Sequence, residues 1–196
     1  MARKKAYEEK IVKLILLKEG TYHLEKQLKI ACPISIHGAG QDKTIVQRHG
    51  IVIEGTKEEK KRVNMQGMTM KGSSYCGLFN VNGLSFLCKD MTFTQCRAAG
   101  VLANNTKGRL INCVITQCEQ SGIWCSSNAL IELEGDQTKV VGNVTSGNSY
   151  CYGLDTYDTS SKIHLLFPLT KESVSTNNHD GRNSGGGGTI KTVDSF

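Results

Sequence analysis

The sequence lacks any apolar run of about 18 residues, so it offers no helix long enough to cross a bilayer. It also lacks the apolar core of a signal peptide: basic residues near the start are followed by Glu8 and Glu9, and the apolar stretch 14–17 is too short. We therefore expect a cytoplasmic protein that does not bind a membrane.

Proline and aromatic residues are scarce. There are two prolines and 6% aromatics against 21 glycines, which favours many turns and few long helices. The net charge of +6 lies entirely within residues 1–62, where 14 Lys and Arg face 8 Asp and Glu. Those basic residues alternate with acids and lack stacking aromatics, so we expect a solvated, charged cap in preference to a nucleic-acid site.

Internal repetition is the strongest pattern in the chain. Three segments align, and each contains a glycine followed by a branched aliphatic residue and then a large apolar residue. These glycines are Gly77, Gly100 and Gly122, which lie 23 and 22 residues apart. A fourth copy ends at Gly153, 31 residues later, and a degenerate fifth ends at Gly181.

The period selects the architecture. Helical repeats need about 33 residues or more, and the fixed leucine and asparagine pattern of a leucine-rich repeat is absent. Repeats rich in Thr, Val, Ile, Asn and Gly favour short strands and tight turns. We predict an all-β, single-stranded, right-handed parallel β-helix of about six or seven coils, stacked roughly 4.8 Å apart. Residues 1–13 are predicted as a short N-terminal capping helix, and residues 14–196 as the β-helix domain.

Strand alternation predicts which side chains face outward. If the residue after each repeat glycine points inward, two interior ladders follow: Leu78, Val101, Ile123 and Leu154, then Asn80, Ala103, Cys125 and Thr156. Two outer columns lie between them: Phe79, Leu102, Trp124 and Asp155, then Val81, Asn104, Ser126 and Tyr157. Three consecutive apolar residues in an outer column require a cover, which is either a segment of the chain itself or a partner. We expect a binding surface formed by Phe79, Leu102, Trp124, Asn104 and Ser126.

The eight cysteines include no Cys-x-x-Cys pair, so a zinc site is not expected. The spacings from Cys88 to Cys113 and from Cys96 to Cys118 approximate the coil period, which predicts reduced thiols stacked in adjacent coils. Structural disulfides are the alternative.

No cofactor is expected, with calcium as an open possibility. Glu132, Glu134 and Asp136 alternate in sequence and would lie on one strand face, where carboxylates could hold Ca²⁺. The alternative is a solvated strand face.

Residues 16–22 and 34–45 are similar to the first coils of the pectin-lyase-like superfamily, which includes pectate lyases, pectin methylesterases, mannuronan epimerases and intracellular β-helix proteins. With the repeats, the resemblance covers about residues 14–190. It implies a right-handed parallel β-helix and leaves the activity open, since this fold carries many functions.

Residues 152–158 resemble the active-site strand of mannuronan C5-epimerases, whose pattern is Tyr-Gly-x-Asp-Pro-His-Asp/Glu. In that family the tyrosine and histidine handle the proton at C5, and the aspartate helps neutralise the sugar carboxyl region. Tyr152, Asp155 and Asp158 match, whereas Thr156 replaces the proline and Tyr157 replaces the histidine. The resemblance implies catalytic roles for Tyr152, Asp155, Tyr157 and Asp158, and the missing histidine puts the proton transfer in doubt.

Two hypotheses of function follow. The first is a binding module that docks a polysaccharide or protein partner on an outer strand face, with His179 and Arg182 as further binding residues. The second is a lyase or C5-epimerase acting on a uronic-acid polymer. It needs cations for the substrate carboxylates, from Lys139, Lys162 or Arg182, and a replacement for the histidine, from His164 or His179.

Overall fold

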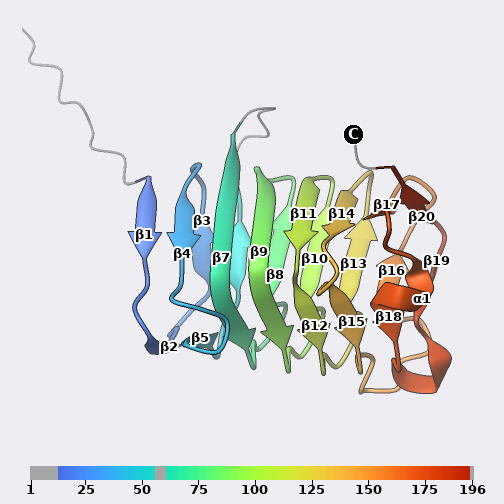
Figure 1. Cartoon of the computed structure of the whole chain (residues 1–196), viewed down its shortest axis with the longest axis horizontal. Coiled ribbons are helices and arrows are strands. Elements are labelled where there is room, and N and C mark those ends of the chain that lie inside the picture. Colours follow the sequence, from blue (N-terminus) through green and yellow to red (C-terminus); the bar gives the residue numbers. More distant parts are fainter. Residues whose placement is uncertain (1–12, 56–60, 195–196) are drawn as a thin grey trace, which may run out of the picture.

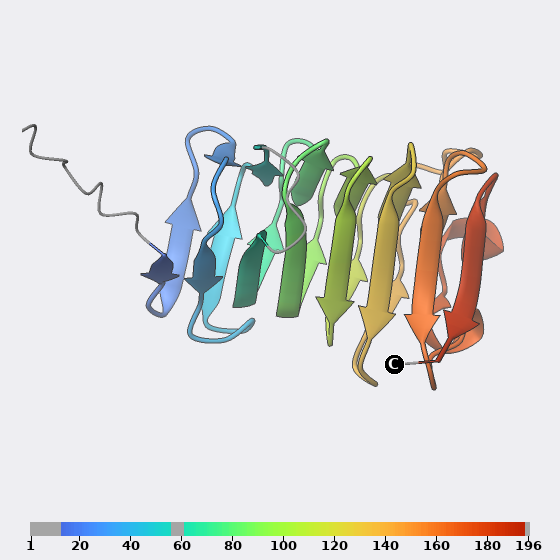
Figure 2. The same cartoon turned by 90° about the horizontal axis from the view of Figure 1, so that it is seen from above.

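The computed structural model describes residues 13–55 and 61–194, which form a right-handed parallel β-helix (Figure 1). The coils follow one another along the long axis of the molecule, and each strand pairs in parallel with the strands of the coils before and after it (Figure 2). The predicted N-terminal helix lies outside the described residues, apart from the exposed Lys13. In the described chain, no helix is long and apolar enough to span a membrane.

Each coil has three faces, and face 1 and face 2 belong to one 13-stranded sheet. Face 1 contains β1 (Leu14–Leu16), β4 (Ser35–His37), the first half of β7 (Arg62–Lys71), the first half of β9 (Ser85–Thr94), β11 (Lys107–Ile111), β14 (Leu130–Glu134), β17 (Lys162–Leu166) and β20 (Thr189–Val193). Face 2 contains β2 (Gly20–His23), β5 (Thr44–Gln47), the second halves of β7 and β9, β12 (Val114–Thr116), β15 (Lys139–Val141) and β18 (Ser175–Thr176).

Face 3 is a 7-stranded sheet with one strand from each coil. It contains β3 (Leu28–Ile30), β6 (Ile51–Ile53), β8 (Leu78–Val81), β10 (Val101–Asn104), β13 (Ile123–Ser126), β16 (Leu154–Thr156) and β19 (Ser184–Gly186). Strand β20 begins the next coil, and the last turns include α1 (Lys171–Val174) and the 3-10 turn η1 (His179–Gly181). The predicted fold class is therefore confirmed for the described residues, which form about eight turns where six or seven coils were predicted.

The repeat glycines stand where adjacent coils approach most closely. A Cβ atom on Gly100 would lie 2.4 Å from Cγ2 of Ile115 and 3.0 Å from the carbonyl oxygen of Gly122. A Cβ atom on Gly122 would lie 2.8 Å from the carbonyl oxygen of Gly153. The repeated glycine is thus a steric requirement of coil stacking. The register corrects one prediction: Leu154 pairs with Ser184, so the fifth copy has Asn183 at the glycine position and not Gly181.

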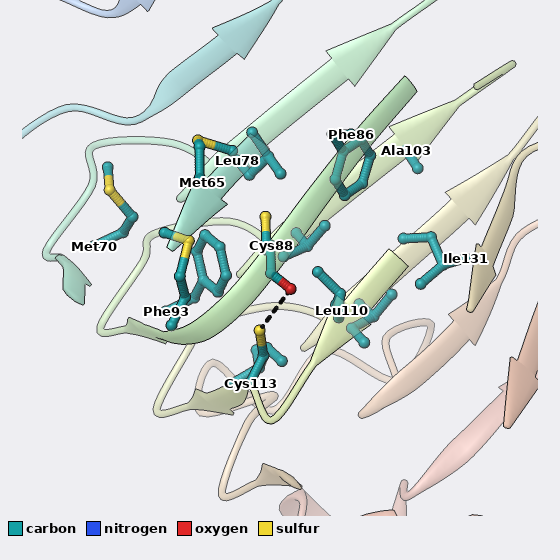
Figure 3. Packing of buried hydrophobic residues seen from close by; sticks show 14 of the residues in the cluster. Met65, Met70, Leu78, Phe86, Cys88, Phe93, Ala103, Leu110, Cys113 and Ile131 are labelled. Carbon is teal, nitrogen blue, oxygen red and sulfur yellow. Dashed lines mark hydrogen bonds between the residues drawn. The ribbon is translucent and has the colours of Figure 1, made fainter. Parts of the chain in front are cut away.

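The core is a continuous stack of apolar side chains along the axis (Figure 3). The two predicted interior ladders are confirmed, because all their members are completely buried: Leu78, Val101, Ile123, Leu154, Asn80, Ala103, Cys125 and Thr156. Asn80 is satisfied inside the core, since its amide nitrogen donates to the Leu84 carbonyl at 2.7 Å and its amide oxygen accepts from the Gly83 N–H at 3.1 Å.

All eight cysteines are free thiols, and only Cys32 is exposed. One predicted stacked pair is confirmed. Thr94 pairs with Thr116, and Cys96 and Cys118 follow these threonines by two residues, so the two cysteines occupy equivalent positions in adjacent coils. The predicted stacking of Cys88 on Cys113 is wrong, because Cys88 pairs with Leu110. Cys113 lies three residues further along, where its Sγ donates to the Cys88 carbonyl at 3.5 Å (Figure 3).

We expect Gly100→Ala to lower the free energy of unfolding by about 2–3 kcal/mol, because the added methyl group overpacks the junction between two coils. Urea unfolding followed by circular dichroism measures this as a lower midpoint. The matched control is Gly187→Ala, whose Cβ would lie 3.4 Å from its nearest atom, and it should change the free energy by less than about 0.5 kcal/mol. Equal losses in the two variants would contradict the steric argument.

Candidate functional site

The predicted outer column on face 3 exists in register. Phe79 pairs with Leu102, Leu102 with Trp124, and Trp124 with Asp155. The column continues to Gly185 in β19. A straight line of outward side chains therefore runs parallel to the long axis, apolar over three coils and acidic at the fourth.

The turns between face 2 and face 3 cover part of this column. Leu102 packs in a cluster with Cys76, Ala98 and Ala99, and it is only 5% exposed. Leu102, which we predicted in the binding surface, therefore presents almost no area to a partner. The chain supplies the cover at this position, which was the alternative to a bound partner.

Aromatic rings remain accessible on either side of Leu102. Tyr75 contacts Phe79 edge-on, with ring centroids 5.4 Å apart. Trp124 contacts Tyr157 with centroids 5.9 Å apart, and Tyr157 is 69% exposed. We call Tyr75, Phe79, Trp124 and Tyr157 the aromatic patch. Phe79 and Trp124 pack against the same covered cluster, which fixes them relative to one another.

Polar groups border the aromatic patch. The amide nitrogen of Asn104 donates to Oγ of Ser126 at 2.9 Å, so these two predicted binding residues are bound to each other. The indole N–H of Trp124 is buried and has no hydrogen-bond partner among the described residues. An unpaired buried donor is unfavourable, and the indole N–H is one of four such polar atoms among the described residues.

Asp155 ends the column in an enclosed position. It is 4% exposed, and its Oδ2 accepts a hydrogen bond from Oγ of Ser121 at 2.6 Å. Burial raises the pKa of the Asp155 carboxyl to about 6, against the opposing effect of hydrogen bonds from Ser121 and the Tyr152 backbone. The carboxyl therefore titrates near neutral pH.

The Tyr152 backbone is hydrogen-bonded to this carboxyl, and Arg182 lies over the Tyr152 ring. The Tyr152 ring covers Gly185, where a Cβ atom would lie 2.4 Å from the ring. The guanidinium carbon of Arg182 lies 5.9 Å from the centre of the same ring, and its Nη1 donates to the Ser149 carbonyl at 2.5 Å. Nε of Arg182 has no partner among the described residues. Tyr152, Asp155 and Arg182 thus gather at one end of the column.

Asp158 stabilises the turn after β16 through hydrogen bonds to backbone N–H groups. Its Oδ2 accepts from the Ser127 N–H at 2.6 Å, and its Oδ1 accepts from the N–H groups of Ser160 and Ser161 at 2.9 and 3.1 Å. These bonds lower the pKa of the Asp158 carboxyl. Its catalytic role remains a prediction from the resemblance, whereas its role in joining two coils is visible.

The histidine alternatives lie away from this strand. His164 is on face 1, in register with Glu132 and Lys191. His179 is in η1, where its Nε2 lies 3.2 Å from Oδ2 of Asp180. Tyr157 follows β16 at the position that the resemblance gives to histidine.

Of the three predicted cations for substrate carboxylates, only Arg182 lies beside Tyr152. Lys139 is on face 2, where its Nζ donates to the Ser173 carbonyl at 2.6 Å. Lys162 is on face 1, at the start of β17. The sequence-predicted positive subsite is therefore spread over three regions of the rod.

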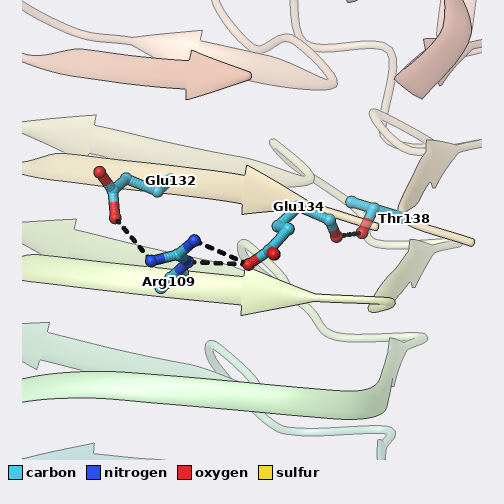
Figure 4. A network of polar contacts seen from close by, with 4 residues as sticks. All are labelled: Arg109, Glu132, Glu134 and Thr138. Carbon is cyan, nitrogen blue, oxygen red and sulfur yellow. Dashed lines mark hydrogen bonds and ion pairs between the residues drawn. The ribbon is translucent and has the colours of Figure 1, made fainter. Parts of the chain in front are cut away.

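Two of the carboxylates considered as calcium ligands form ion pairs with an arginine. Arg109 lies 2.8 Å from Oε2 of Glu134 and 3.9 Å from Oε2 of Glu132 (Figure 4). Asp136 does not alternate with them, since β14 ends at Glu134. In the part of the chain that the structure describes, no group of three or more His, Cys, Asp or Glu side chains could hold a metal.

Three residues that sequence reasoning missed, Cys76, Ala99 and Ser121, sit directly before the repeat glycines, at the position that the predicted Tyr152 holds in the fourth copy. This position supplies both the cover over Leu102 and the hydroxyl that binds Asp155. The repeat alignment contained the signal, because a residue one position before a fixed glycine must recur at one corner of the coil.

No family model and no curated protein matches the chain. Among solved structures, the chain is similar to the mannuronan C-5 epimerase AlgE4 A-module of Azotobacter vinelandii, at 10% identity, over 94% of this chain and 89% of that chain, with a TM-score of 0.22. A likeness of this size carries no argument about activity.

Asp155→Asn should flatten the pH dependence of stability. The pKa of the Asp155 carboxyl is about 6 in the folded state, above its value in the unfolded state. At low pH the carboxyl is protonated in both states and does not affect stability. As the pH rises through 6, the free energy of unfolding falls by up to about 3 kcal/mol, because the unfolded state ionises more readily than the folded state. Asparagine keeps the acceptor for Ser121 and cannot ionise. Urea unfolding at pH 4 and pH 7.5 should therefore show a stability gain of the variant over the wild type that grows with pH.

The control for this experiment is Asp136→Asn, which changes an exposed aspartate in the turn after β14. Its stability difference from the wild type should be the same at both pH values within about 0.5 kcal/mol. A profile of Asp155→Asn parallel to that of the wild type would contradict the burial of an ionisable carboxyl.

Proposed function

We propose that the protein is a β-helix binding module that docks a polysaccharide on face 3, with the aromatic patch as the docking surface. The observation that carries the proposal is the contact of Trp124 with the largely exposed Tyr157 on a straight outer column. Aromatic rings combine a large apolar area with few rotatable bonds, so they bind the flat apolar side of a sugar ring at low entropic cost.

The arrangement suits an extended polymer. Phe79 and Trp124 lie two coils apart, which at the usual strand spacing is about 10 Å. The axis through them runs along the rod, so a linear chain laid on face 3 would meet successive rings.

A second candidate is a polysaccharide-modifying enzyme, a lyase or C5-epimerase, acting on a uronic-acid polymer. It is favoured by the carboxyl of Asp155, whose pKa of about 6 suits general acid–base work, and by the neighbouring Tyr152, over whose ring Arg182 lies. An arginine is well suited to bind a substrate carboxylate. This candidate ranks second because Asp155 is 4% exposed and Tyr157 stands in place of the histidine.

We expect Trp124→Ala combined with Tyr157→Ala to weaken polysaccharide binding about 5- to 150-fold, since each lost stacking contact is worth roughly 0.5–1.5 kcal/mol. Affinity gel electrophoresis against a panel of neutral and uronic-acid polysaccharides provides the measurement. The control is Tyr150→Ala, which removes a tyrosine that is 86% exposed and outside the aromatic patch. Equal weakening by the control, or no binding to any polymer by the wild type, would contradict the proposal.

A proton NMR time course with the same polymers separates the two candidates. Binding alone leaves the anomeric signals unchanged in position and number. New anomeric or unsaturated-sugar signals that disappear in Asp155→Asn would contradict the binding module and support the enzyme.

A further inference from the structure

Face 1 presents a surface of different chemistry from face 3. Its outward positions hold Arg62, Lys89, Lys107, Arg109, Lys162 and Lys191, against Glu132 and Glu134. Both glutamates are paired with Arg109 (Figure 4). The remaining cations have no ion pair within residues 13–55 and 61–194, so the face carries a net positive charge that the described residues do not neutralise.

Three of these cations form a line at the edge of face 1. Arg62 pairs with Ser85, and Lys107 pairs with Leu130, which pairs in turn with Lys162. Ser85 and Lys107 are adjacent as well, because the residues that follow them are paired. Arg62, Lys107 and Lys162 therefore recur at every second coil, about 10 Å apart. We call these three residues the basic column.

The basic column borders two hollows in the surface. One, of about 450 Å³, is lined by Lys13, Lys61, Arg62 and Asn64 among others. The second, of about 290 Å³, is lined by Arg62, Lys107 and Arg109 among others. Arg62 lines both hollows, so the two hollows adjoin at this residue, and the surface beside the basic column is concave.

An unpartnered donor or acceptor lies on the same face. Nε2 of His164 is buried and has no hydrogen-bond partner among the described residues. Burial, followed by the nearby charge of Lys191, lowers the pKa of this histidine. An anion bound on this face would meet the lysine charges beside the ring, since the ring nitrogen itself is covered.

We propose that face 1 binds an acidic, carboxylate-bearing polysaccharide along the basic column. Cations repeated in a straight line match a polymer with regularly repeated anions. A single-stranded nucleic acid fits less well, because the outward positions of the face 1 strands in the described chain include no Phe, Tyr or Trp on which bases could stack. This surface uses other residues than the aromatic patch, so it stands or falls independently of the function proposed for face 3.

The test measures binding of polygalacturonate, with neutral dextran as the reference polymer. Arg62→Gln, Lys107→Gln and Lys162→Gln combined should lower the affinity for polygalacturonate about tenfold, as expected for three exposed charge pairs. The matched control combines Lys43→Gln, Lys71→Gln and Arg97→Gln, which removes the same charge from exposed positions on face 2 and its turns. It should change the affinity less than about twofold.

Further outcomes decide between the surfaces. Wild-type affinity should fall steeply with added salt, and the loss caused by the three substitutions in the basic column should be the same with and without Trp124→Ala and Tyr157→Ala. Equal losses in the two triple variants would reduce the effect to net charge and overturn the proposal. Binding that depends on the aromatic patch alone would overturn it and leave the function proposed for face 3 intact. An oligonucleotide that binds more tightly and depends on the basic column would overturn the choice of ligand.

Discussion

The parallel hydrogen bonding of each coil to the next is the constraint on which the rest of the structure depends. The N–H of Leu78 donates to the Gly100 carbonyl at 3.0 Å, and the N–H of Ile123 donates to the Gly153 carbonyl at 2.9 Å. Bonds of this kind hold successive coils at one strand spacing. At that spacing the corner before face 3 has no room for a Cβ atom, and each inward side chain must stack on its counterpart in the next coil.

This constraint explains which features the sequence predicted. A fixed glycine with a period near 22 sets the register, and register plus strand alternation sets the inward and outward positions on face 3. The buried ladders and the outer column from Phe79 to Asp155 followed from these two facts alone. The prediction failed where coil length changes, as at Asn183, because a visual alignment has no means of placing inserted residues.

Contacts between coils are the other feature that the sequence did not predict. Glu132 and Glu134 do lie on one strand face, yet the group between them is Arg109 from the preceding coil, 25 residues before Glu134. In the same way, the hydroxyl on Asp155 comes from Ser121, 34 residues earlier. The alternation of residues within one strand predicts which face of the strand a side chain lies on. It does not predict which residue of the next strand the side chain contacts, since that depends on the register of a different segment.

Asp155 is the position that coil stacking does not explain. From Val52 to Gly185, every other member of its column is apolar or glycine, and a buried carboxyl that ionises near pH 6 opposes folding at neutral pH. Asparagine would accept the Ser121 hydrogen bond without that cost. A residue that departs from its structural optimum, next to an arginine and a tyrosine with exposed aromatic rings alongside, is typical of a site shaped by a ligand. The enclosed carboxyl of Asp155 is therefore the feature of face 3 for which the stacking of the coils gives no reason.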